Sequence, residues 1–183
     1  MKFSTKAKNL INLKKLNLKK SIIPKFYYYS VEELTRNKKK IIETININLN
    51  KKISIRSSFF LEDKSSSSLA GEFDGCYNVK NNKKQILSGI KFLINQYKKK
   101  SKNKKIFLKS EIIFQNHLID STLSGVLTNK CIKDGTDYYV INYDDTSGRT
   151  NTVTSGSKTG GRVINIFRDE TNFIRSKKLR KII

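Results

Sequence analysis

One stretch of the chain carries the side chains best suited to bind an anion. An alternating β-branched run over residues 53–55 leads to Arg56, Ser57 and Ser58, and a serine-rich segment that ends at Gly71 follows. A guanidinium offers a planar fork of donors that stays charged, while hydroxyl and backbone N–H groups can surround the remaining oxygens of a phosphate. The stretch therefore predicts a phosphate-binding loop, and the alternative is an edge strand that runs into a solvated serine linker.

Several blocks of this stretch match a known signature in both order and spacing. They are Arg56-Ser57-Ser58, Glu62-Asp63, Ser68-Leu69-Ala70-Gly71-Glu72-Phe73 and Tyr77-Asn78-Val79. The pattern resembles the "RSSxxxED…SFAGxF…LNV" motif in the nucleotide-binding domain of the pyruvate phosphate dikinase and phosphoenolpyruvate synthase family. The resemblance implies an ATP-grasp fold that binds ATP, with the arginine on the phosphates, Ser57, Ser58 and Gly71 shaping the loop, and a phosphoryl group passed onward.

Two further segments extend the resemblance. Residues 6–10 are similar to the family's "GGKxxNL" start, which implies that Lys6 contacts ATP. Residues 112–118, followed by 124–127, resemble "VxVQxM…SGVxFT", which implies that Gln115 and His117 border the adenine pocket. His117 stands where the family usually has methionine, and a structural histidine is the alternative to any catalytic role.

A paired carboxylate follows a run of β-formers near the end of the resemblance. Residues 138–148 and 152–156 read "YYVINYDDTSG…VTSG", a form similar to synthase-like enzymes of capsule biosynthesis, among them L-glutamine kinases. Asp144 and Asp145 at a strand end could orient phosphates that carry Mg²⁺. The alternative is a turn built from residues that favour turns.

Composition limits the other function classes. The net charge of +23 would ordinarily indicate a nucleic acid or an anionic surface as partner. The excess is lysine spread along the whole chain with Asn and Ile, all encoded by A/T-rich codons, so we do not expect nucleic-acid binding as the main function.

Cys76 and Cys131 lack the spacing of a zinc site, and reduced thiols are expected. Without an apolar run that could span a bilayer or a secretory signal, the sequence predicts a cytoplasmic protein without a membrane partner.

Hydrophobic periodicity predicts an α+β fold. An amphipathic helix is expected within residues 1–20, and a second helix should begin at the capping box formed by Ser30 and Glu33. A third helix over residues 84–99 should end in a basic segment over 98–105, which is predicted as a surface loop with an anion-binding patch as the alternative. Asp134-Gly135 predicts a turn that folds a strand ending near Ile132 back onto the next one. Short β-rich runs predict strands over 27–29, 106–108, 112–115, 124–128, 138–143 and 163–167.

The resemblance covers residues 6–169 and implies an ATP-grasp-like, mostly antiparallel mixed sheet with packed helices. It divides the chain into a helical start (1–50), a phosphate-loop region (51–105), a β-rich adenine-pocket region (106–170) and a basic tail (171–183). The family's later Mg²⁺-binding residues, phosphohistidine domain and acceptor domain have no counterpart here, which implies an incomplete domain with unknown catalytic residues.

The expected function is the ATP-binding portion of a Mg²⁺-dependent kinase, with glutamine or pyruvate as acceptor by resemblance. A second polypeptide is one conceivable source of the missing C-terminal part. The alternatives are a truncated, non-catalytic remnant of such an enzyme and a basic protein that binds polyanions or nucleic acids.

Overall fold

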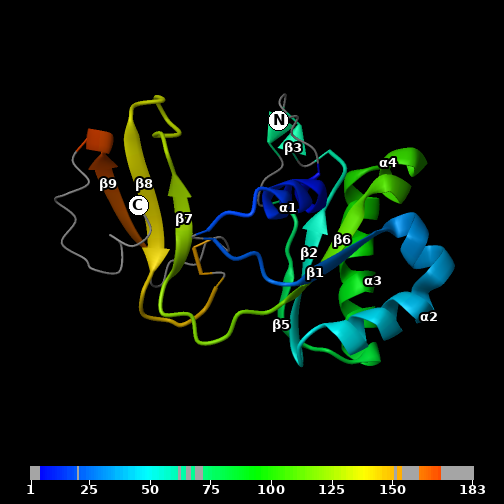
Figure 1. Cartoon of the computed structure of the whole chain (residues 1–183). Coiled ribbons are helices and arrows are strands. Elements are labelled where there is room, and N and C mark those ends of the chain that lie inside the picture. The colour runs from blue at the N-terminus through cyan, green and yellow to red at the C-terminus, as the bar shows by residue number, and fades with distance from the viewer. Residues whose placement is uncertain are drawn as a thin grey trace. The chain divides into compact units, whose positions relative to one another are not determined.

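The chain combines helices with antiparallel sheets, so the expected α+β class is confirmed. The computed structural model describes residues 5–19, 21–61, 63–64, 67–68, 72–150, 152–153 and 161–169. The chain divides into two compact units, Met1–His117 and Leu118–Ile183, each with its own sheet (Figure 1). Within the described ranges, no helix is both long enough and apolar enough to cross a bilayer.

The first unit is built on a four-stranded sheet in the order β1-β6-β2-β5, in which all neighbouring strands are antiparallel. The two central strands, β2 and β6, pair in continuous register from Ile53 opposite Asn116 to Ser58 opposite Glu111. The strands are β1 (Phe26–Ser30), β2 (Lys52–Ser58), β5 (Cys76–Lys80) and β6 (Glu111–Asn116). The helices are α1 (Lys6–Lys15), α2 (Val31–Asn48), α3 (Lys83–Lys100) and α4 (Lys104–Lys109), and a separate hairpin pairs β3 (Asp63–Lys64) with β4 (Ser67–Ser68).

One face of this sheet forms the hydrophobic core. Because side chains alternate along a strand, Ile53 and Ile55 of β2 lie on the same face as Ile112 and Phe114 of β6, and all four are fully buried. Helices α2 and α3 cover that face (Figure 1). Their buried apolar stripes are Val31, Leu34, Ile41, Ile42 and Ile45 on α2, and Ile86, Ile90, Leu93 and Tyr97 on α3.

The start of α2 is fixed by local chemistry, as the capping box predicts. The Ser30 Oγ accepts a hydrogen bond from the Glu33 backbone N at 3.1 Å, and the Glu33 carboxylate accepts one from the Ser30 backbone N at 2.7 Å. Two orphan N–H groups at the helix end are thereby satisfied. Strand β1 therefore passes directly into α2, with Ser30 as both the last strand residue and the N-cap.

The strand predicted over residues 106–108 is wrong, because these residues belong to helix α4. Asn103 caps this helix by accepting hydrogen bonds from the backbone N of Lys105 and of Ile106, at 3.0 and 3.2 Å. Ile106 and Phe107 pack against the core from a helical turn, and a run of three apolar residues has too little periodicity to distinguish the two structures. The basic segment 98–105, predicted as a loop, is accordingly mostly helical, with only 101–103 between α3 and α4.

The second unit is a three-stranded antiparallel sheet in the order β7-β8-β9. The strands are β7 (Ser124–Thr128), β8 (Tyr138–Asp144) and β9 (Arg162–Phe167), which confirms three of the predicted strands. Ile141 and Tyr143 are buried on one face against Ile164 and Ile166. Gly125 allows β7 to approach β8 closely, because a Cβ at this position would lie 2.4 Å from the Asn142 carbonyl oxygen.

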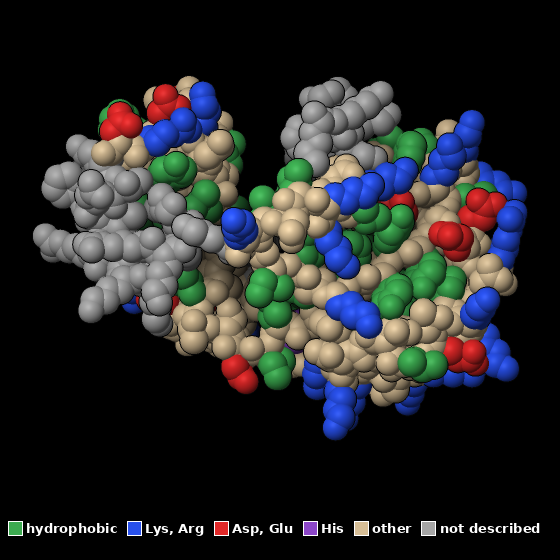
Figure 2. Space-filling view, viewed as in Figure 1, with side chains coloured by type: hydrophobic (Ala, Val, Ile, Leu, Met, Phe, Trp, Pro, Cys, Tyr) green, Lys and Arg blue, Asp and Glu red, His purple; other side chains and the backbone are tan. Residues whose placement is uncertain are grey.

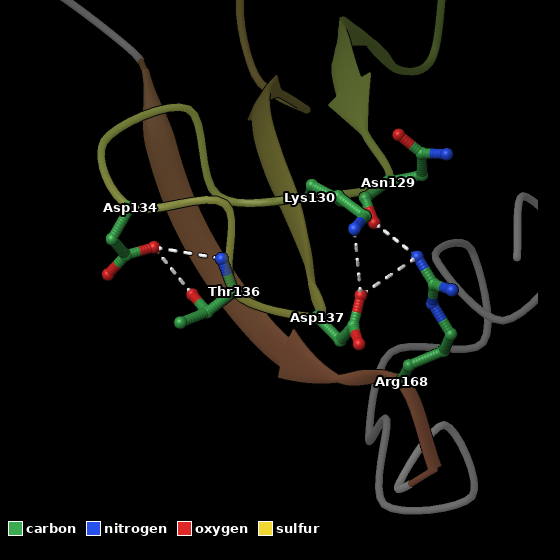
Figure 3. Close-up of polar contacts among 6 residues, drawn as sticks. All are labelled: Asn129, Lys130, Asp134, Thr136, Asp137 and Arg168. Atoms are coloured by element: carbon green, nitrogen blue, oxygen red, sulfur yellow. Dashed lines mark hydrogen bonds and ion pairs between the residues drawn. The ribbon is translucent and has the colours of Figure 1, made fainter.

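The predicted turn at Asp134-Gly135 is present, but the preceding strand ends at Thr128 rather than near Ile132. Gly135 adopts φ +73°, and its N–H bonds to the Cys131 carbonyl at 2.9 Å. Figure 3 shows how the loop over 129–137 is held: the Asp134 carboxylate accepts from the N and Oγ1 of Thr136, while Asp137 lies between Lys130 and Arg168. These exposed contacts hold the loop between β7 and β8, which is longer than a two-residue hairpin loop.

Candidate functional site

The face of the first sheet opposite α2 and α3 carries a row of polar side chains on its two central strands. The β2–β6 register places Ser54 opposite Gln115 and Ser58 opposite Glu111, with Arg56 between them on β2. His117 follows directly after β6 and contacts Ser54. We refer to Ser54, Arg56, Ser58, Glu111, Gln115 and His117 as the polar face.

Arg56 occupies the middle of the polar face. It is half-buried, and its Nη1 donates to the Gln115 Oε1 at 3.4 Å. No carboxylate in the described part of the chain pairs with it. A partly desolvated guanidinium with one neutral partner retains several donors and a charge that only an anion would neutralise. Arg56 therefore has the features of an anion-binding side chain.

His117 lies at one end of the polar face. Its Nδ1 is 2.8 Å from the Oγ of Ser54, which is itself buried, and its backbone N donates to the Lys52 carbonyl at 3.1 Å. Burial, and then the nearby charge of Lys52, lower the pKa of His117 below its usual value of 6.5. The imidazole is therefore mainly neutral at pH 7, as suits contact with an uncharged ring.

The other end of the polar face is closed by the start of α1. Glu111 is only 6% exposed, and its Oε2 accepts from the Thr5 Oγ1 at 2.5 Å and from the Ser58 Oγ at 3.1 Å. The Ser58 Oγ in turn accepts from the Ala7 backbone N at 3.0 Å. The sequence-based prediction missed Glu111, although an acidic residue at the head of an apolar strand is an available signal.

The structure brings together most of the residues predicted to hold ATP, but not all of them. Lys6 precedes Ala7 and so lies at the Ser58 end, while Arg56, Ser58, Gln115 and His117 share the polar face. Ser57 lies on the opposite face, buried with the core, because neighbouring strand residues point to opposite sides. Gly71 lies outside the described residues.

Asp144 and Asp145 belong to the second unit, at the end of β8. The Asp144 carboxylate accepts from the backbone N of Thr146 at 2.9 Å, from the backbone N of Ser147 at 3.0 Å, and from both of their hydroxyls. These hydrogen bonds, those from Ser147 above all, hold the pKa of Asp144 well below its usual range. Asp145 Oδ2 lies 3.5 Å from the Arg162 Nη1. The geometry of Asp144 is that of a turn-forming carboxylate.

No cluster of three or more His, Cys, Asp or Glu side chains suited to a metal ion occurs among the described residues. The oxygens of Asp144 are already engaged by the turn that follows it. The described residues therefore hold no preformed all-protein metal cage, and because Mg²⁺ commonly takes one or two carboxylates together with substrate phosphates, the role of Asp144 and Asp145 toward Mg²⁺-bound phosphates stays a prediction.

Comparison with known proteins adds no relative from which a function could be transferred. No protein-family model matches this chain, and no curated protein sequence matches it either. We therefore infer function from the geometry of the polar face and from the motif resemblance.

Proposed function

We propose that the chain is the ATP-binding portion of a phosphotransferase similar to phosphoenolpyruvate synthase and pyruvate phosphate dikinase, with an ATP-grasp-like fold. The polar face of β2 and β6 is the proposed nucleotide site. The observation that carries this proposal is Arg56, a half-buried cation without a carboxylate partner in the described chain, on the same face as Gln115 and His117.

The polar face is neutral at the end where Ser54 contacts His117, and it carries a cation, Arg56, farther along β2. In this proposal the base lies near His117 and Gln115, while the phosphates lie near Arg56 and Lys6. A guanidinium and an ammonium group both favour negative charge.

The proposal assigns no protein ligands to a metal ion. No cluster of three or more His, Cys, Asp or Glu side chains occurs among the described residues, so in this proposal Mg²⁺ enters bound to the phosphates of ATP. The resemblance of residues 138–156 to L-glutamine kinases favours a side-chain amide as acceptor over pyruvate. That part of the proposal rests on motif similarity alone.

Calorimetric titration of Mg-ATP, at moderate salt and with a polyanion competitor, tests the proposal. The unsubstituted chain is compared with Arg56→Ala and with Arg36→Ala. Arg36 is a matched control, because it carries the same charge but lies exposed on α2, paired with Glu32 at 2.7 Å. We expect Arg56→Ala to weaken ATP binding at least tenfold, about 1.4 kcal/mol, and Arg36→Ala to change it less than twofold.

The same titration distinguishes the proposed site from diffuse attraction of polyanions. On the face shown in Figure 2, the Lys and Arg side chains of the first unit are spread around its surface in separate groups. Diffuse binding would therefore weaken equally in both variants and fall steeply with salt. Equal loss in the two variants, or no saturable binding in the unsubstituted chain, would overturn the proposal.

A further inference from the structure

A buried carboxylate joins three segments that are far apart in the sequence. Glu111 accepts hydrogen bonds from Thr5 at the cap of α1 and from Ser58 at the end of β2, and Ser58 accepts from the first turn of α1. Thr5, Ser58 and Glu111 are all at least nine-tenths buried. We refer to this set, together with the Ala7 backbone N, as the helix latch.

The charge of Glu111 complements the helix that it holds. The first turn of α1 contains no acidic residue, although a helix N-terminus favours negative charge. In the described chain Glu111 has only hydroxyl donors as hydrogen-bond partners and no cation. The carboxylate therefore supplies, from strand β6, the negative charge that α1 lacks. Hydrogen bonds to a charged acceptor are also about twice as strong as neutral ones.

The latch fixes the position of Lys6 relative to Arg56. Lys6 lies between Thr5 and Ala7, both of which are bound by the latch, and Ser58 lies two residues from Arg56 on the same face of β2. We propose that Glu111 is a positioning residue for the nucleotide site, which holds the start of α1 against β2 so that Lys6 and Arg56 act on the same phosphate group. This inference rests on the proposed function.

The first test uses the ligand-free chain and needs no nucleotide. Amide hydrogen exchange is measured for α1, α2 and α3 in the unsubstituted chain, in Glu111→Gln and in Glu33→Gln. Glu33 is the matched control, because its carboxylate also serves a helix N-terminus, that of α2. We expect Glu111→Gln to reduce protection of the α1 amides about five- to tenfold and to leave α3 unchanged. Glu33→Gln should affect only α2, and unchanged α1 protection in Glu111→Gln would overturn the latch.

The second test measures the coupling between Glu111 and Lys6. Mg-ATP affinity is determined for Glu111→Gln, for Lys6→Ala and for the double variant. We expect Glu111→Gln to weaken binding at least fivefold in the unsubstituted background and less than twofold once Lys6 is removed. A merely structural role would lower affinity by the same factor in both backgrounds, and that result would overturn the positioning role.

The two tests also separate failure of the latch from failure of the proposed function. If the unsubstituted chain does not bind Mg-ATP, the proposed function and the positioning role both fail, while hydrogen exchange still decides whether the latch holds α1. If Glu111→Gln does not fold, Ser58→Ala removes one hydroxyl donor of the carboxylate and the acceptor of the Ala7 backbone N, and it leaves the Thr5 cap of α1 in place. That variant should loosen α1 in the same way, and full protection of α1 in it would contradict the proposal.

Discussion

Replacing Tyr97 with phenylalanine removes a single buried oxygen from the place where β2 ends and β6 begins. The Tyr97 hydroxyl accepts from the Ser58 backbone N at 3.0 Å and donates to the Glu111 carbonyl at 2.7 Å. Its ring is fully buried and lies 5.3 and 5.4 Å from the rings of Phe59 and Phe73. A phenylalanine ring keeps this packing, so the substitution tests the hydroxyl alone.

The expected loss follows from the two backbone groups that the hydroxyl satisfies. A buried donor or acceptor left without a partner costs about 1–3 kcal/mol. With one donor and one acceptor affected, we expect Tyr97→Phe to lower the free energy of unfolding by about 2–6 kcal/mol. Because Ser58 and Glu111 also hold α1 through their side chains, ATP affinity should fall as well.

Urea unfolding followed by circular dichroism measures this loss. Tyr28→Phe is the matched control, because Tyr28 lies partly buried on β1 and its hydroxyl makes no hydrogen bond in the described chain. The control should change the free energy of unfolding by less than about 0.5 kcal/mol. A loss of unfolding free energy of about 0.5 kcal/mol or less for Tyr97→Phe, with an unchanged dependence of that free energy on urea concentration, would refute the argument that the Tyr97 hydroxyl bridges the two strands.

Two further outcomes test the ends of the first unit's elements. Ser30→Ala should destabilise the first unit by about 1 kcal/mol, because the backbone N of Glu33 loses its acceptor; thermal unfolding measures it, and an unchanged midpoint would contradict the cap. His117, the only histidine of the chain, should titrate by NMR with a pKa below 6.5, and Lys52→Gln should raise that pKa. Since the folded state disfavours the charged imidazole, the stability that neutral His117 contributes is present above pH 6.5 and is lost as pH falls. An NMR titration midpoint of His117 at or above 6.5 would show that burial does not lower its pKa.

Local signals in the sequence predicted most of the elements. The capping box at Ser30 and the apolar stripes of α2 and α3 predicted these helices, because capping and 3.6-residue periodicity depend on neighbouring residues. An alternating β-branched run similarly predicted β2, and a run rich in β-branched and aromatic residues predicted β8. The prediction failed for 106–108, where Asn103 starts a helix in a run too short to show a period.

The sequence by itself supplied the types of residue that the proposed nucleotide site needs and predicted the strands that carry them. Only the tertiary structure decided which of them share a face: Arg56 and Ser58 join Gln115 and His117, whereas Ser57 turns into the core. The reason is that sheet register is set by the packing of Ile53, Ile55, Ile112 and Phe114 beneath the helices, and a shift of one residue would reverse every side chain. The same long-range pairing brought Glu111 to the start of α1, a contact between residues separated by 106 positions that no local pattern encodes.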